Sequence, residues 1–465
     1  MTDTRPDVSA PATNRYLEGN YGPVTEEITA VDLPVIGELP AELAGRYLRN
    51  GPNPATPPAD PAGHHWFMGD GMVHGVRLRD GRAEWYRNRY VGSRSMSELR
   101  GEPDIAGPNW SGGGTGPNTN VGGFAGTTWA MVEAGGTPVE LTYELETVGR
   151  NDFGGTLPGA FTAHPKVDPD TGEMHAMVYA WAQWMDHVQY VVVGPDGTVT
   201  RTVDIPLPGM TMLHDMSLTQ RYAVVYDQPC TVDLDVAFAG RFPFRWDPDY
   251  GNRVGLLPRD GEAADITWID VPLGYSFHPM NAYDTPDGRV VIDLCVYDVM
   301  FDLDQLGPFG EPTLPRLERW ELDPARRSAS TTVIDETANE FPRHRGSLST
   351  KPHRYGYCAS PSGEPGAGWP TLKHDLHTGE RSVFDHGPGR AAGEPVFVGR
   401  EGDDAEDGGW LVTFVHDLNT DGAELVVLDA QDLDRGEVAR VQLPQRIPFG
   451  FHGNWVSDRS VAPSS

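Results

Sequence analysis

Cysteine is scarce in this sequence. The 465 residues contain three cysteines, Cys230, Cys295 and Cys358, and none of them belongs to a Cys-x-x-Cys pair. An odd number of cysteines at such distances predicts neither a disulfide framework nor a zinc finger, and it is typical of proteins of the reducing cytoplasm. The sequence therefore predicts a cytoplasmic protein.

Positive charge is also scarce. The chain has 36 Lys and Arg residues against 67 Asp and Glu residues, which gives a formal net charge of −31 at pH 7. A nucleic-acid partner requires a basic face for its phosphates, so this balance excludes one. It does not exclude peripheral contact with neutral lipid through a local apolar patch. The sequence does not predict an oligomeric state.

Long apolar runs are missing as well. No stretch approaches the ~20 apolar residues that a membrane-spanning helix needs, and the polar N-terminus lacks the apolar segment of a secretory signal. We expect residues 1–14 to form a disordered tail and residues 15–465 to form a single domain. That domain should be soluble, with at most a peripheral attachment to membranes.

Glycine and proline, in contrast, are abundant, with 55 and 41 residues. Pairs such as Asp196-Gly197, Asp287-Gly288 and Asp421-Gly422 separate short runs of β-type sequence, which predicts hairpins. Long helical periodicity is scarce. The pattern predicts an all-β fold, which could be a sandwich array, a barrel or a propeller. The length favours a seven-bladed propeller with roughly 66 residues per blade, which leaves room for insertions.

One segment, Thr231–Pro258, does not alternate like a strand and is rich in aromatic residues. They are Phe238, Phe242, Phe244, Trp246 and Tyr250. Two interpretations remain open: the segment forms a cap over one face of the propeller, or it is an ordered surface loop.

Four histidines lie beside small, aromatic or apolar residues: His164, His214, His278 and His452. Their spacing matches no local zinc motif. In a propeller the first two intervals correspond to about one blade each and the third to about three, so the four side chains could meet on the axis. Four imidazoles would suit a redox-capable metal such as iron, with positions left for O2. Spacing alone leaves buried structural histidines as the alternative.

The sequences around these histidines resemble the carotenoid cleavage oxygenase family, which includes carotenoid, apocarotenoid and lignostilbene dioxygenases and retinal pigment epithelial membrane protein. The resemblance extends from about Arg15 to Val456, and the motifs occur in family order. They are Arg46–Asn53, Gly69–Val76, Phe161–Lys166, Leu213–Asp215, Phe244–Pro248, Phe277–Tyr283 and Gly450–Gly453. The resemblance implies a seven-bladed β-propeller with a loop and helical cap, and one Fe(2+) per chain on the axis.

The resemblance also implies residue roles. The metal ligands would be His164, His214, His278 and His452, whereas His74 would be a packed strand histidine. Three glutamates would orient the ligands by accepting hydrogen bonds from their second nitrogens: Glu133, Glu340 and Glu394. The activity implied is cleavage of a conjugated C=C bond with O2 to two carbonyl products. No catalytic residue beyond the metal site is required.

The expected substrate is a small apolar polyene, a carotenoid or apocarotenoid. Aromatic residues beside the ligands would line its tunnel, with a threonine near the open metal position: Phe67, Phe277, Phe341 and Thr119. Stilbene-cleaving relatives carry a lysine before the first glutamate and a Tyr-Arg-Asn-Pro segment upstream. This chain has Val132 before Glu133 and the stretch 107–113 in place of that segment, which weighs against phenolic stilbenes.

Other functions remain open at this point. Within the family, the chain could be a stilbene-type dioxygenase or could have isomerase-like activity. In a different class, it could be a propeller hydrolase such as a lactonase, although a Ca²⁺ site on the axis would call for oxygen ligands instead of imidazoles. A non-catalytic propeller scaffold would leave the four histidines without a purpose.

Overall fold

The computed structural model describes residues 14–110, 114–310, 314–362 and 367–458. Most of the expected tail, residues 1–13, lies outside these ranges. Asn14 does not behave as part of a tail. Its side chain is buried, accepts a hydrogen bond from the Tyr16 amide and donates to the carbonyls of Pro61 and His64. None of the helices in the described ranges has the length and apolar character needed to cross a membrane.

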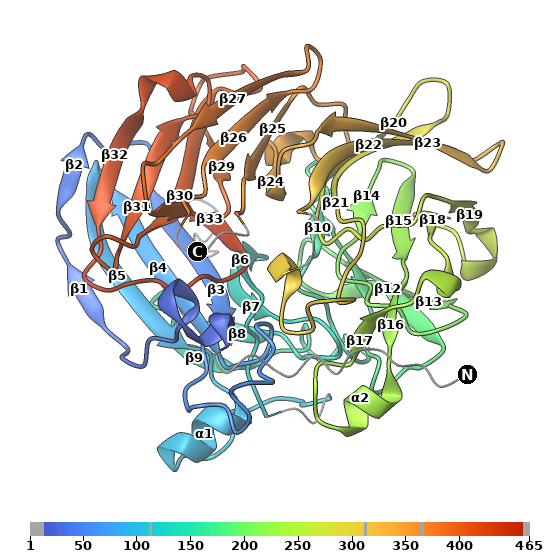
Figure 1. Cartoon of the computed structure of the whole chain (residues 1–465), viewed down its shortest axis with the longest axis horizontal. Coiled ribbons are helices and arrows are strands. Elements are labelled where there is room, and N and C mark those ends of the chain that lie inside the picture. The colour runs from blue at the N-terminus through green and yellow to red at the C-terminus, as the bar shows by residue number, and fades with distance from the viewer. Residues whose placement is uncertain (1–13, 111–113, 311–313, 363–366, 459–465) are drawn as a thin grey trace.

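Seven antiparallel sheets surround a central axis (Figure 1), which confirms the predicted seven-bladed β-propeller. Five blades have four strands each, numbered here from the second to the sixth blade in chain order. The second blade comprises β6 (Asn120–Phe124), β7 (Thr127–Met131), β8 (Val139–Leu141) and β9 (Thr147–Arg150). The third comprises β10 (Lys166–Val167), β11 (Met174–Val178), β12 (His187–Val193) and β13 (Val199–Pro206).

The next three blades repeat this order from the axis outward. The fourth comprises β14 (Ser217–Leu218), β15 (Tyr222–Asp227), β18 (Arg253–Pro258) and β19 (Thr267–Asp270). The fifth comprises β20 (Pro279–Asp284), β21 (Val290–Val296), β22 (Arg316–Asp323) and β23 (Ser328–Asp335). The sixth comprises β24 (Glu340–Arg343), β25 (Tyr355–Ala359), β26 (Thr371–Asp375) and β27 (Glu380–Phe384).

The two ends of the chain close the ring in the first and seventh blades. The first blade comprises β33 (Gly453–Ser457), β3 (Gly45–Pro52), β4 (Gly71–Arg79), β5 (Arg82–Tyr90) and β1 (Thr29–Val31). The seventh comprises β28 (Arg390–Ala392), β29 (Val396–Gly399), β30 (Gly409–Asp417), β31 (Gly422–Asp429), β32 (Glu437–Gln442) and β2 (Val35–Gly37). Because β33 pairs with β3 from Gly45↔Ser457 to Arg49↔Gly453, the last strand of the chain is the innermost strand of the first blade.

The strand sequences explain this layering. Every residue of β21 is buried, and its sequence is a nearly continuous apolar run, as expected for a strand covered on both faces. The outer strand β23 of the same blade is mostly exposed and rich in Ser and Thr. The predicted Asp-Gly turns lie between strands, where Gly197 and Gly288 adopt φ of +81° and +90°, a region open to glycine.

The aromatic segment is a cap over one face, but it ends earlier than the sequence suggests. It contains β16 (Cys230–Val232), α2 (Leu234–Phe238), β17 (Phe244–Trp246) and the 3-10 helix η3 (Pro248–Tyr250). Residues 253–258 are instead β18, which pairs with β15 and β19 inside the fourth blade. Residues 254–257 of β18 are buried, so the strand has no polar face and shows no alternation.

The remaining helices are short and lie in the connections. The α-helix α1 (Arg94–Arg100) begins at the cap Ser93 and ends at Gly101, whose φ is +69°. In Figure 1, α1 and α2 lie toward the same edge of the molecule. The other 3-10 helices are η1 (Arg15–Leu17), η2 (Gly19–Tyr21), η4 (Ala263–Asp265), η5 (Pro308–Gly310), η6 (Gly346–Leu348) and η7 (Leu433–Arg435).

Candidate metal centre

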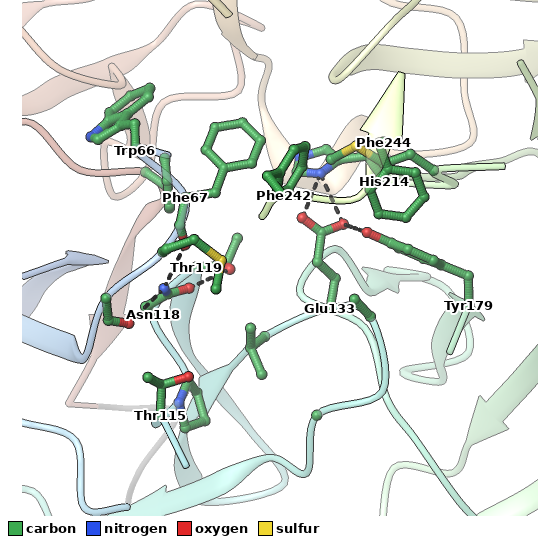
Figure 2. A pocket seen from close by; sticks show the side chains of 18 of the residues that line it. Trp66, Phe67, Thr115, Asn118, Thr119, Glu133, Tyr179, His214, Phe242 and Phe244 are labelled. Atoms are coloured by element: carbon green, nitrogen blue, oxygen red, sulfur yellow. Dashed lines mark hydrogen bonds and ion pairs between the residues drawn. The ribbon is translucent and has the colours of Figure 1, made fainter. Parts of the chain in front are cut away.

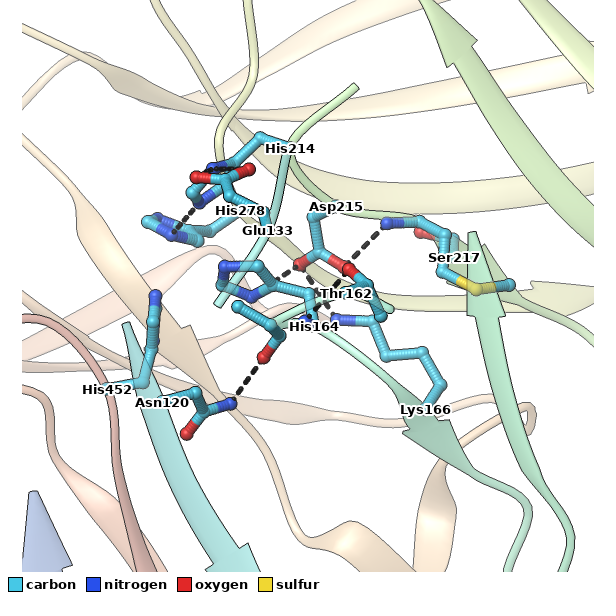
Figure 3. Close-up of polar contacts among 12 residues, drawn as sticks. Asn120, Glu133, Thr162, His164, Lys166, His214, Asp215, Ser217, His278 and His452 are labelled. Atoms are coloured by element: carbon cyan, nitrogen blue, oxygen red, sulfur yellow. Dashed lines mark hydrogen bonds and ion pairs between the residues drawn. The ribbon is translucent and has the colours of Figure 1, made fainter. Parts of the chain in front are cut away.

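Four histidines meet where the inner strands of four blades begin. His164, His214, His278 and His452 precede β10, β14, β20 and β33, in the third, fourth, fifth and first blades. All four are buried, and one potential ligand atom from each lies within 4.8 Å of those of the other three. Figure 3 shows their rings around a common space. The structure therefore brings together the quartet that the sequence singled out.

The three predicted glutamates come from the other three blades. Glu133 follows β7 in the second blade, Glu340 begins β24 in the sixth, and Glu394 lies between β28 and β29 in the seventh. Each blade therefore places one of these seven side chains near the axis.

Each glutamate accepts a hydrogen bond from one histidine. Both carboxylate oxygens of Glu133 lie 2.9 Å from Nδ1 of His214. Glu340 lies 2.5 Å from Nδ1 of His278, and Glu394 lies 3.1 Å from Nδ1 of His452. This contact puts the proton on Nδ1 and leaves the Nε2 lone pair to face the common space.

Each glutamate is in turn held by a residue that the sequence did not single out. The Tyr179 hydroxyl donates to Glu133 over 2.9 Å, and the Tyr297 hydroxyl donates to Glu340 over 3.1 Å. Arg343 donates from Nε to Glu394 over 2.8 Å. These partners fix the carboxylates, and through them the orientation of the imidazole rings.

The backbone is unusual directly after two of the glutamates. Ala134 and Phe341 have φ of +59° and +52°, in the left-handed region that non-glycine residues rarely adopt. The Phe341 amide donates to Glu340 over 2.6 Å, so the turn bends the carboxylate back toward its own chain. Such conformations cost roughly 1–3 kcal/mol each and tend to occur at functional sites.

Protonation states in the cluster suit a cation. Burial lowers the pKa of His278 and of His452, although the neighbouring Glu340 and Glu394 work in the opposite direction. Burial by itself would raise the pKa of Glu340 and Glu394, but their histidine partners and hydrogen bonds, with Arg343 at Glu394, outweigh it and leave both pKa values lowered. In these two pairs, neutral imidazoles and ionised carboxylates result, which is the state that metal binding needs.

The donor set also fits a divalent ion by charge. Three carboxylates and the guanidinium of Arg343 leave two negative charges around the cluster, and the nearby pair of Asp215 and Lys166 adds none. The buried Nε2 of His164 has no hydrogen-bond partner within the described ranges. One dication would neutralise the assembly and give that nitrogen a ligand role. The converging atoms are nitrogens, which suit iron-group metals better than Ca²⁺.

An apolar cavity of about 460 Å³ opens from the cluster beneath the cap. All four predicted substrate residues line it, namely Phe67, Thr119, Phe277 and Phe341, together with His214, His278 and His452. Phe242 and Phe244 of the cap complete the aromatic wall, and Figure 2 shows them with Phe67 near His214. Val132 also lines this cavity.

A second cavity of about 440 Å³ meets the same cluster and is more polar than the first. It shares His278 and His452 with the apolar cavity. Its polar lining includes Lys166, Asp215, Ser217, Asn281, Arg343 and Asn454. These residues follow the histidines along the inner strands or lie beside those strands, whereas Met212, Phe277 and Phe451 of the apolar cavity precede them. The two cavities therefore lie on either side of the histidines along the axis.

His74 takes no part in the cluster. It lies in β4, where its Nδ1 is 2.9 Å from the Tyr86 hydroxyl. It is therefore a packed strand histidine, as the resemblance implies.

Comparison with known proteins agrees with this geometry. The sequence profile of the family described as "Retinal pigment epithelial membrane protein" matches residues 21–457. The chain is 43% identical to a carotenoid cleavage oxygenase of Mycobacterium tuberculosis, over 96% of this chain and 98% of that protein. It is 34% identical to a carotenoid 9,10(9',10')-cleavage dioxygenase of Crocus sativus, over 96% and 90% of the two chains.

Solved structures show the same architecture. The lignostilbene dioxygenase of Pseudomonas brassicacearum superposes with a TM-score of 0.86 at 28% identity, covering 97% of this chain and 100% of that one. A cobalt-substituted ACO of Synechocystis superposes with a TM-score of 0.83 at 27% identity, covering 95% and 98%.

Proposed function

This chain belongs to the carotenoid cleavage oxygenase family and is an oxygenase, and from that premise we propose an Fe(II)-dependent dioxygenase that cleaves a conjugated C=C bond of a carotenoid or apocarotenoid with O2. Two carbonyl products would result. The observation that carries the proposal is the cluster of four buried histidines at the inner end of an apolar, aromatic-walled cavity.

One Fe(2+) per chain would be held by His164, His214, His278 and His452, and when bound it would supply the electron that makes ground-state O2 reactive. The protein's part is to present four neutral nitrogens in fixed positions. Glu133, Glu340 and Glu394 perform this by fixing the tautomer of three rings. No side-chain nucleophile or acid–base pair is needed.

The apolar cavity selects the substrate and the bond. Its aromatic residues offer a dry surface to a polyene, and Phe277 and Phe341 lie in ring contact with His214 and His278. A double bond held against these rings is within reach of the metal position while water is excluded. Thr119 lines the same space, and its carbonyl accepts the His452 amide over 3.1 Å.

One position in the cavity supports a polyene over a phenolic stilbene. A phenol hydroxyl needs a polar or charged partner when buried. Val132, beside Glu133, provides an apolar surface at the position where the stilbene-cleaving relatives carry lysine.

We also propose that the protein is cytoplasmic and contacts membranes peripherally, where a polyene would dissolve. Phe238 at the end of α2 is 84% exposed, and Leu234 on the same helix is also exposed. This helix belongs to the cap that covers the apolar cavity.

The pairing of β33 with β3 closes the ring of blades, which supports a single domain over residues 15–465.

The test combines metal analysis with turnover. Purified protein should contain one iron per chain, and it should consume O2 with an apocarotenal and form two carbonyl products. Stoichiometric calcium, or no metal after anaerobic purification with Fe(2+), would refute the iron site. Turnover of a hydroxystilbene alone would keep the iron site and refute the substrate class.

A further inference from the structure

Among the described residues, His164 differs from the other three histidines because no glutamate forms an ion pair with it. Its nearest carboxylate belongs to Asp215, whose Oδ2 lies 3.6 Å from Nδ1 of His164. Figure 3 shows this carboxylate between the ring of His164 and the side chain of Lys166. A separation of 3.6 Å is too long for a direct hydrogen bond, but a buried charge acts strongly at this distance.

Asp215 is firmly held. Its side chain is only 2% exposed, its Oδ2 accepts from Nζ of Lys166 over 2.8 Å, and its Oδ1 accepts from the Met216 amide over 2.6 Å. Asp215 directly follows His214, and Lys166 lies two residues after His164. The pair therefore links the inner ends of the third and fourth blades: Asp215 lies in the loop that carries His214, and Lys166 begins β10 just after His164.

We propose that Asp215 is the positioning residue of His164 and that Lys166 balances its charge. This proposal rests on the metal site of the proposed function. Asp215 attracts the Nδ1–H of His164 and so keeps the Nε2 lone pair directed at the common space, where none of the described residues forms a hydrogen bond with it. Asp215 therefore orients His164 as the glutamates orient the other three histidines.

The charge of the assembly explains why a lysine accompanies this carboxylate. Glu133, Glu340 and Glu394 with Arg343 already leave two negative charges, which one dication neutralises. A fourth carboxylate without a counter-charge would leave one negative charge buried beside the occupied site, and unpaired buried charge is costly. Lys166 removes that excess, so His164 is the ligand with the weakest anionic support.

The direction in which each substitution changes Co²⁺ affinity distinguishes this role from that of an ion pair that only stabilises the fold. If Asp215 acts on His164, Asp215→Asn should weaken Co²⁺ binding about 10- to 100-fold. Lys166→Met should strengthen it by about threefold or more, because the unbalanced carboxylate attracts a dication. Lys166→Arg should resemble the unaltered protein. A plain ion pair would predict that both single changes weaken binding alike and that the double variant recovers it.

The experiment titrates the full-length, metal-free protein with Co²⁺, followed by the visible absorption of the bound ion. Asp215→Asn should also shift the Co²⁺ bands, because His164 would bind in an altered orientation, and Asp215→Glu should restore them. Thermal melts of the metal-free variants check folding. Lys373–Asp407, a mostly buried pair with an Nζ–Oδ2 distance of 2.7 Å, is the matched control: Lys373→Met and Asp407→Asn should leave affinity and bands unchanged.

Two results would overturn the proposal. One is equal weakening by Asp215→Asn and Lys166→Met with recovery in the double variant. The other is unchanged Co²⁺ affinity and absorption in a folded Asp215→Asn protein. A failure of the unaltered protein to bind Co²⁺ would instead refute the proposed metal site itself, so the two failures are distinguishable.

Discussion

The two cavities that meet at the histidine cluster have similar volumes but differ in how polar their linings are. The apolar cavity beneath the cap is walled by aromatic rings, among them Phe67, Phe277 and Phe341. The polar cavity on the other side contains Lys166, Asp215 and Arg343. The same imidazoles thus separate a mostly apolar compartment from one that is richer in polar and charged side chains.

This difference separates two tasks that would interfere in one space. Charged groups beside a polyene would hold water and cost the substrate its apolar contacts. Two of the carboxylates, Glu133 and Glu340, border the apolar cavity and are held there by tyrosine hydroxyls, whereas Glu394, which pairs with a guanidinium, lines the polar cavity. In our proposal, the loops that precede the inner strands bind the substrate, and the ion pairs Lys166–Asp215 and Arg343–Glu394 lie on the other side of the histidines. Single substitutions on either side can test this division.

The largest effect should come from the cluster that both cavities share. His452→Ala removes a ligand, so the protein should retain no stoichiometric iron and lose turnover entirely. Metal analysis after gel filtration and O2 consumption check this. His416→Ala is the control, because His416 is also buried but bonds the Gly422 carbonyl in the seventh blade. Full iron content in His452→Ala would show that the quartet is not the ligand set.

On the polar side, Arg343→Met should destabilise the metal-free protein. The Glu394 side chain is 3% exposed. Among the described residues, Arg343 is the only Arg or Lys that forms an ion pair with it, and the substitution removes this partner. Breaking a fully buried pair costs about 3–5 kcal/mol, and the partial exposure of Arg343 reduces the expected loss to about 2 kcal/mol. Chemical denaturation measures the free energy of unfolding.

The metal-loaded form makes this prediction specific. A bound dication compensates Glu394 through His452, so Arg343→Met should cost less stability there than in the metal-free protein. Arg345→Met, two residues along and bonded to loop carbonyls, should change either form by no more than about 0.5 kcal/mol. Equal losses in both forms of Arg343→Met would mean that its role is independent of the metal.

On the apolar side, Phe67→Ala should weaken substrate binding and leave the metal in place. Phe67 packs edge-to-face against Phe242, Phe277 and Phe451. Losing its contact with a polyene should raise KM about 10-fold, equivalent to ~1.4 kcal/mol of lost burial, with unchanged iron content. Steady-state kinetics with an apocarotenal measure this.

Phe124 provides the matched control because it lines the polar cavity. Phe124→Ala should leave KM unaltered. If both phenylalanine variants raised KM alike, the assignment of the substrate to one side would be wrong.

Sequence reasoning reached the cluster but not the residues that support it. The four histidines and three glutamates stand in motifs that could be matched position by position. Tyr179, Tyr297 and Arg343 have no such signal, because their contacts depend on how neighbouring blades are aligned in space. The sequence also does not predict the two separate cavities, because their positions depend on the direction in which the inner strands leave the histidines.

Two expected boundaries differ from the structure for physical reasons. The lack of alternation groups Thr231–Pro258 as one cap or surface loop, yet Arg253–Pro258 is a blade strand whose central residues are buried. Asn14 was assigned to the tail because it follows a polar stretch, yet its amide group bonds two distant carbonyls. Periodicity reports a strand only where one face meets water, and a polar residue can be buried when its hydrogen bonds are satisfied.

The smallest predicted effect concerns the strained backbone turn that positions the Glu133 carboxylate at the border of the apolar cavity. Ala134 has φ of +59°, which costs an alanine roughly 1 kcal/mol more than a glycine. Ala134→Gly should therefore stabilise the protein by up to about 1 kcal/mol, while the freer backbone should loosen Glu133 and reduce kcat modestly. Ala125→Gly relieves a similar φ of +50° in the β6–β7 turn and should stabilise without affecting kcat. An unchanged kcat in both variants would mean that the strained turn after Glu133 has no role in positioning the carboxylate.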